Sequence, residues 1–94
     1  QELYCENNQL TTLNISGLVN LHRLDCFNNL LPSLILSGLT NLQVLKCYNN
    51  QITNLDLTQN TSLTNAYCQN NLLTSLNVSQ YFTLPLYLLN TVVT

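Results

Sequence analysis

Four cysteines are the residues whose type most invites chemistry, because thiolates bind metals, form disulfides and act as nucleophiles. They lie 21 residues apart, at Cys5, Cys26, Cys47 and Cys68. A regular repeat would stack these sulfurs in a straight column, whereas tetrahedral zinc needs ligands around a point. Parallel Cβ directions also disfavour the dihedral angle of a disulfide. We therefore expect reduced cysteines that pack as small apolar side chains, with no metal and no cofactor; adventitious disulfides or a metal remain the alternatives.

Asparagine doublets follow the cysteines with the same 21-residue period, at residues 7–8, 28–29, 49–50 and 70–71. A buried asparagine can pair both kinds of backbone group where a chain turns, since its amide donates and accepts hydrogen bonds. We predict that the second asparagine of each doublet belongs to a structural ladder, formed by Asn8, Asn29, Asn50 and Asn71. The first asparagine of each doublet is expected to lie toward solvent and to remain available for a ligand.

No arrangement of residues in the sequence predicts catalysis. His22 is the single histidine, no two carboxylates share a pocket by spacing, and buried cysteines without a cationic neighbour are poor nucleophiles. We predict a protein that is not an enzyme. Three Asn-x-Ser/Thr triplets begin at residues 14, 60 and 77, and we interpret them as by-products of an Asn- and Ser-rich repeat rather than as glycosylation sites.

The composition argues against two classes of partner. Lys and Arg together number two, Asp and Glu four, and the net charge is −2, in a chain where about a quarter of the residues would ordinarily be charged. Two basic residues cannot neutralise a row of phosphates, so nucleic acid is not expected as a partner. No stretch approaches the roughly 20 apolar residues of a membrane-spanning helix, so membrane insertion is not expected.

The same period extends to several apolar columns, one of which holds Leu10, Leu31, Ile52 and Leu73. Six columns keep phase without insertion or deletion, and the unit reads L-x-x-L-x-C-x-x-N-x-L-x-x-L-x-L followed by five linker positions. Because one such unit cannot bury its apolar side alone, successive units must stack and share a core.

Each unit predicts two short extended segments. Leu24 and Cys26 alternate with polar or aromatic neighbours, and a period of two is typical of a half-buried strand. Stacking these strands gives a parallel sheet with a spacing of about 4.8 Å. The opposite stretch, such as residues 13–15, is too short for an α-helix and predicts an extended or 3₁₀ segment. A hydroxyl column follows it, suited to local side-chain-to-backbone bonding, and consists of Ser16, Ser37, Thr58 and Ser79.

The repeat, spelled LHRLDCFNNLLPSLILSGLTN at residues 21–41, resembles the leucine-rich repeat family, and most of all the 21-residue cysteine-ladder repeats of internalin J and related bacterial surface proteins. The resemblance covers residues 1 to about 80. It implies a right-handed solenoid with a parallel β-sheet on the concave face, short extended or 3₁₀ segments on the convex face and little or no α-helix. It also implies a non-catalytic protein-recognition or adhesion module that is extracellular or on the cell surface. The alternative is a structural spacer or isolated repeat fragment with no dedicated ligand.

The outward strand positions carry five of the six charges and four of the seven aromatic residues. Rigid aromatics with a few charges are typical of protein interfaces, so we predict a concave binding face made of Tyr4, Glu6, Arg23, Asp25, Phe27, Lys46, Tyr48, Tyr67 and Gln69. The same positions predict cross-strand ion pairs, Glu2 with Arg23 and Asp25 with Lys46. Such a face covers about 400 Å², half of the roughly 800 Å² that one partner gives to a stable interface, so weak binding is expected.

We interpret residues 1–94 as a single domain of about four repeats, with no N-terminal cap and a degenerate apolar final rung at residues 81–94. In register with the repeats, the core leucine column reaches Tyr87 and the cysteine column reaches Leu89. Pro85 suits an edge strand. An open apolar end predicts truncation from a longer protein, a homo-oligomer through this C-terminal edge, or an unfamiliar cap.

Overall fold

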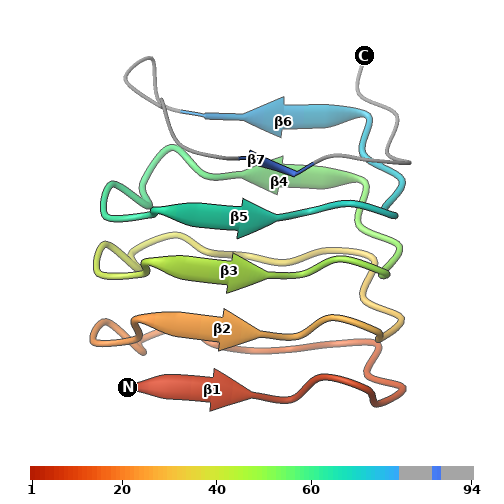
Figure 1. Cartoon of the computed structure of the whole chain (residues 1–94), viewed down its shortest axis with the longest axis horizontal. Coiled ribbons are helices and arrows are strands. Elements are labelled where there is room, and N and C mark those ends of the chain that lie inside the picture. The colour runs from red at the N-terminus through yellow and green to blue at the C-terminus, as the bar shows by residue number, and fades with distance from the viewer. Residues whose placement is uncertain (79–85, 88–94) are drawn as a thin grey trace.

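A computed structural model describes residues 1–78 and the backbone of residues 86–87. The chain winds into a parallel β-solenoid of about four turns, each of about 21 residues (Figure 1). We call each turn a rung. The described residues contain no helix. The predicted solenoid of parallel strands is therefore confirmed.

Two parallel sheets lie on opposite sides of the rungs (Figure 1). The five-stranded sheet has one strand from each rung, in the order β1 (Glu2–Tyr4), β2 (Arg23–Asp25), β3 (Val44–Lys46), β5 (Asn65–Tyr67) and β7 (Leu86–Tyr87). The two-stranded sheet pairs β4 (Asn54–Asp56) with β6 (Ser75–Asn77). The predicted extended segments opposite the main sheet are thus present as β4 and β6, and no 3₁₀ segment occurs in the described residues.

The register of the five-stranded sheet follows the 21-residue period through four rungs, with Leu24 opposite Leu45 and Leu45 opposite Ala66. The fifth strand departs from it by one residue, because Leu86 lies opposite Ala66 and Tyr87 opposite Tyr67. The prediction that Tyr87 continues the leucine column is therefore wrong. A shift of one residue exchanges the two faces of a strand. In the observed register, Leu86 rather than Tyr87 lies opposite Ala66. Pro85 and Leu89 lie outside the described residues, and the homo-oligomer through this edge stays a prediction.

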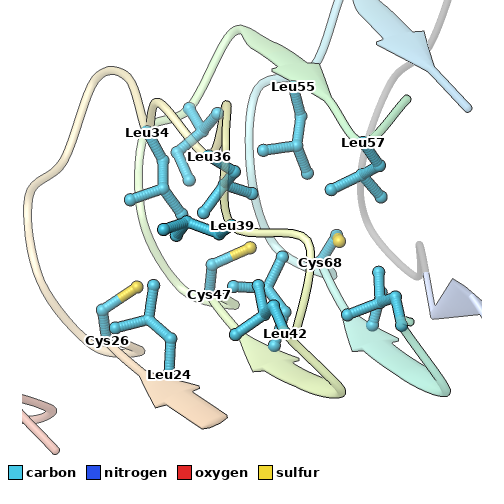
Figure 2. Packing of buried hydrophobic residues seen from close by; sticks show 14 of the residues in the cluster. Leu24, Cys26, Leu34, Leu36, Leu39, Leu42, Cys47, Leu55, Leu57 and Cys68 are labelled. Atoms are coloured by element: carbon cyan, nitrogen blue, oxygen red, sulfur yellow. The ribbon is translucent and has the colours of Figure 1, made fainter. Parts of the chain in front are cut away.

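The core lies between the two sides of each rung. Leu24, Leu45 and Ala66 are fully buried behind the five-stranded sheet. Figure 2 shows Cys26, Cys47 and Cys68 in a row, with leucines of the opposite segments on the other side of the row. Burial of each leucine side chain stabilises the fold by about 1.5–3 kcal/mol. The buried leucines of successive rungs belong to one continuous core cluster, as the repeat requires.

The hydroxyl column bonds differently from the prediction. The Ser16 hydroxyl donates to Oδ1 of Asn14 at 2.7 Å, and the Thr58 hydroxyl donates to Oδ1 of Asp56 at 2.6 Å. In each case the backbone N–H of the Ser or Thr donates to the same oxygen. The side chain that reaches the backbone is therefore the Asn or Asp two residues earlier, and the hydroxyl adds a second donor to it. Ser79 lies outside the described residues.

Candidate functional site

The second asparagine of each doublet joins neighbouring rungs where the strands of the five-stranded sheet end. Nδ2 of buried Asn50 donates to the carbonyls of Cys47, at 3.1 Å, and of Cys26 in the preceding rung, at 3.0 Å. Its Oδ1 accepts the backbone N–H of Leu31 at 3.0 Å. Asn29 and Asn71 repeat this pattern. The predicted asparagine ladder is confirmed, and its rungs are linked through backbone groups rather than amide to amide.

Asn8, the first member of the predicted ladder, is exposed. Its Nδ2 donates within its own rung to the carbonyls of Cys5, at 2.9 Å, and Glu6, at 3.1 Å. These bonds correspond to those that the buried asparagines make within their own rung. Water can replace these bonds at an exposed site, so Asn8 contributes less to stability than its buried equivalents.

The first asparagine of each doublet is exposed, as predicted, and its amide also bonds to the equivalent amide of a neighbouring rung, which the sequence did not predict. Nδ2 of Asn28 donates to Oδ1 of Asn7 at 2.6 Å, and Nδ2 of Asn49 donates to Oδ1 of Asn28 at 2.6 Å. Asn70 continues the chain of amides at 2.7 Å. All four have φ between 57° and 59°, a left-handed conformation that asparagine tolerates better than most residues. That tolerance, together with the 21-residue spacing, is the sequence signal that could have revealed this second ladder.

The four cysteines are free thiols, and Cys26, Cys47 and Cys68 are buried. Burial raises the pKa of Cys26 to about 12. A hydrogen bond to Cys68 and burial raise the pKa of Cys47 well above its ordinary value. A protonated thiol is neither a good nucleophile nor a metal ligand. In the part of the chain that the structure describes, no three His, Cys, Asp or Glu side chains are placed to hold a metal ion.

Three ring contacts connect the aromatic residues of the predicted binding face. Phe27 and Tyr48 stack with their ring centroids 4.5 Å apart and their planes 10° apart. The guanidinium of Arg23 lies 5.7 Å from the ring centroid of Tyr4, and Nζ of Lys46 lies 5.3 Å from that of Tyr67. Each contact joins neighbouring rungs. We call the surface of the five-stranded sheet that carries these side chains the outer face, defined by Tyr4, Arg23, Phe27, Lys46, Tyr48 and Tyr67.

The cross-strand ion pairs predicted for this face are wrong. Within the described residues the one ion pair lies inside strand β2, where Nε and Nη2 of Arg23 donate to the two carboxylate oxygens of Asp25, each at 3.0 Å. The planar fork of arginine matches a carboxylate two residues away on the same side of the strand. This hydrogen bond also raises the pKa of Arg23.

Several predicted site residues are less exposed than expected. Asp25 is buried, with 4% of its surface accessible, because Arg23 and its neighbours cover it. Half-buried side chains are those of Glu6 and Gln69, together with the rings of Phe27, Tyr48 and Tyr67. Tyr4 is 52% exposed, and its hydroxyl donates to Glu2. On this face solvent therefore reaches the aromatic rings and Lys46, while Asp25 is covered and positions Arg23.

Of the three Asn-x-Ser/Thr triplets, the one at Asn60 is buried, and its Nδ2 donates to the carbonyls of Leu36 and Leu39. An amide held in this way cannot carry a glycan in the folded chain. The described residues also contain no helix of the length and hydropathy that a bilayer span requires.

Comparisons with protein-family models, with curated proteins and with solved structures give no significant match to this chain.

Proposed function

We propose that this protein is a leucine-rich repeat protein of the cysteine-ladder type that acts as a non-catalytic recognition or adhesion module. It binds a partner protein through the outer face, in an extracellular or cell-surface setting. The 21-residue solenoid with its buried asparagine ladder is compatible with that family. The cell-surface setting rests on the resemblance of the repeat alone.

The observation that carries this proposal is the preformed row of rings and cations on the outer face. The Phe27–Tyr48 stack lies between two cation–π contacts, Tyr4 with Arg23 and Tyr67 with Lys46. Ordering a flexible side chain on binding costs about 0.5–1.5 kcal/mol, and these side chains are ordered before a partner arrives. The core consists of other residues, so packing of the interior does not explain why aromatics occupy these positions.

Charge on the outer face is close to balanced, because Arg23 is paired with Asp25. Lys46 is the cation that remains beside the aromatic rings, and Glu2 and Glu6 lie in the first rung. Balanced charge predicts a partner whose contact is mainly apolar and aromatic, with single charges that fix its orientation.

The competing function is a structural spacer. The observation that favours a spacer is that the ring contacts and the ion pair of the outer face all form between residues of this chain. A spacer needs the same contacts for stability alone, so the two functions differ only in whether a protein binds there.

A capture experiment separates these two functions. The immobilised full chain is exposed to an extract of cell-surface proteins, alongside a Phe27→Ala/Tyr48→Ala variant. A Val19→Ala/Leu72→Ala variant is the matched control, because these two apolar residues are 52% and 58% exposed and lie outside the strands. Circular dichroism and melting curves check that all three are folded.

Recognition predicts at least one protein that is retained by the wild type and by the control but lost by the Phe27/Tyr48 variant. Equal recovery of every protein by all three forms contradicts recognition through this face and favours the spacer.

A further inference from the structure

A hollow of about 320 Å³ lies on the side of the solenoid away from the five-stranded sheet. It separates residues 34–37 of the second rung from strands β4 and β6. Figure 2 shows Leu34, Leu36 and Leu55, which line it, on the far side of the cysteine row from the sheet. Its volume is at the lower end of the roughly 300–1,000 Å³ of small-molecule sites.

The hollow exists because the second and third rungs are joined at its ends and not along its length. Strand β4 pairs with β6, and no ladder pairs residues 34–36 with β4 in this described region. The backbone N–H of Thr53 donates to the Pro32 carbonyl at one end. At the other end, Gln59 Oε1 accepts the N–H of Gly38 at 2.7 Å. These contacts fix both ends and leave the middle open.

Among the described residues that line this hollow, Asp56 has the one ionisable side chain. It is exposed, and its Oδ1 accepts the hydroxyl and the backbone N–H of Thr58. The hydrogen bond from the Thr58 hydroxyl has the larger effect and the bond from its N–H the smaller, and both lower the pKa of Asp56. The carboxylate is therefore ionised at neutral pH and retains a second oxygen for a ligand.

The fold does not require a charge at this position. Two rungs earlier, in the first rung, Asn14 accepts the N–H of Ser16 at 3.1 Å and its hydroxyl at 2.7 Å, the same two bonds that Asp56 makes with Thr58. The equivalent residue in the fourth rung is Asn77, also an amide. An amide oxygen is thus sufficient for the local structure, and the negative charge of Asp56 is left without a structural role.

We propose that this hollow binds a guanidinium group carried on an aliphatic stem, as in the side chain of arginine. Asp56 supplies the opposite charge, and the described part of the lining contains no cation that would compete for it. Amide side chains of Asn54 and Asn77 add planar polar groups around the carboxylate. Leu34 and Ile35, the latter 70% exposed, form an apolar wall for the stem.

A guanidinium fits this lining better than an ammonium group does. It presents five N–H donors in a planar fork and is more weakly hydrated, so it can reach several separated acceptors beside an apolar wall. The site is independent of the outer face, and its test does not depend on the proposed recognition of a protein there.

The test is a titration of the full-length ¹⁵N-labelled chain with N-acetyl-L-arginine amide, followed by amide chemical shifts. The expected result is weak saturable binding, with a Kd of about 1 mM or higher, and shifts concentrated at Ser37, Asp56, Gln59 and Asn77. The citrulline analogue has nearly the same shape without the charge and should produce no saturable shift. The lysine analogue should bind several-fold more weakly.

Two variants locate the charge. Asp56→Asn should weaken arginine binding at least fivefold while leaving the fold intact, as the bonds of Asn14 show an amide can do. Glu2→Gln removes the same charge from the first rung of the other sheet and should bind as the wild type does.

Equal shifts with citrulline, unchanged binding by the Asp56→Asn variant, or shifts that map to the outer face would each overturn the proposal. Lysine binding as tight as arginine would overturn the guanidinium assignment. Saturable binding of methyl glucoside at the same amides, without arginine binding, would replace the ligand class with a neutral sugar.

Discussion

The amide of Asn50 lies between two rungs and bonds to both of them, which makes it a sensitive point of the fold at the scale of one residue. Asn50→Ala leaves the buried N–H of Leu31 without its partner, and it removes one of the two amide donors from each of the Cys26 and Cys47 carbonyls, which keep their bonds to Asn29 and Asn71. A buried polar group without a partner costs about 1–3 kcal/mol, so we expect the free energy of unfolding to fall by about 2–4 kcal/mol. Urea denaturation measures this.

Asn8→Ala is the matched control for that prediction, because Asn8 makes the local bonds at an exposed site. We expect it to cost less than about 1 kcal/mol. An unchanged unfolding midpoint for Asn50→Ala, or equal losses for both variants, would refute the ladder role.

The exposed amide ladder can be separated from the backbone conformation beneath it. Asn28 has φ 58° and bonds to the asparagines before and after it. Asn28→Gly removes the amide but accepts the left-handed backbone, whereas Asn28→Ala removes the amide and adds strain of about 1–2 kcal/mol. We expect the alanine variant to unfold at lower urea than the glycine variant. If both have the same midpoint, backbone strain is not what selects asparagine here.

The buried thiol of Cys26 makes stability depend on alkaline pH. Its pKa rises from 9.0 to about 12 on folding, so the folded chain holds the proton more tightly than the unfolded chain. The resulting stabilisation is complete below pH 9 and is lost as pH rises through about 12, with a maximum of about 4 kcal/mol. We expect the melting temperature to fall across this window, and to fall less in a Cys26→Ala variant. A fall of the same size in both forms would show that Cys26 is not responsible.

At the scale of the element, the free energy lost with a core side chain depends on how many strands lie beside the strand that carries it. Leu45 is fully buried in β3, with β2 and β5 beside it, whereas half-buried Leu3 in β1 has β2 on one side. Leu45→Ala should cost about 3–4 kcal/mol, within the usual 2–5 kcal/mol for a buried leucine, and Leu3→Ala less than half of that. Chemical denaturation compares the two variants. Equal costs would contradict the rung-by-rung view of stability.

The repeat period was sufficient to predict the strands, the parallel sheet and the buried asparagines, because each follows from a column of like residues. It failed where residues within one rung interact. Arg23 bonds to Asp25 inside its own strand rather than to the neighbouring rung, and a column of positions does not show that choice. The period also did not predict the register of β7, because β7 follows β5 one residue earlier than the 21-residue spacing would place it.

The candidate site was predicted in part. The sequence located the aromatics and charges on one face of the strands, and the ring contacts between neighbouring rungs agree with that placement. The burial of Asp25 and the exposed amide ladder were missed, because both depend on side-chain contacts that alternation alone does not specify. The hollow beside Asp56 was missed because it arises from an absent strand pairing rather than from a residue pattern.

At the scale of the whole molecule, the solenoid presents two different surfaces. The outer face has stacked rings with nearly balanced charge, while the opposite side has a hollow with an apolar wall and, among its described residues, one carboxylate. The same rungs form both surfaces. The buried asparagines and the core leucines join these rungs, so the two surfaces are held in a fixed position relative to each other. A partner that contacts only one side leaves the other free for a second ligand.

Recognition through the outer face is tested most directly by the dissociation constant of a captured partner protein for three forms of the full chain. The wild type and the Val19→Ala/Leu72→Ala control should bind it with the same Kd, and Phe27→Ala/Tyr48→Ala should raise the Kd at least tenfold, a loss of about 1.4 kcal/mol. A Kd that stays the same in all three folded forms would contradict recognition by the stacked rings.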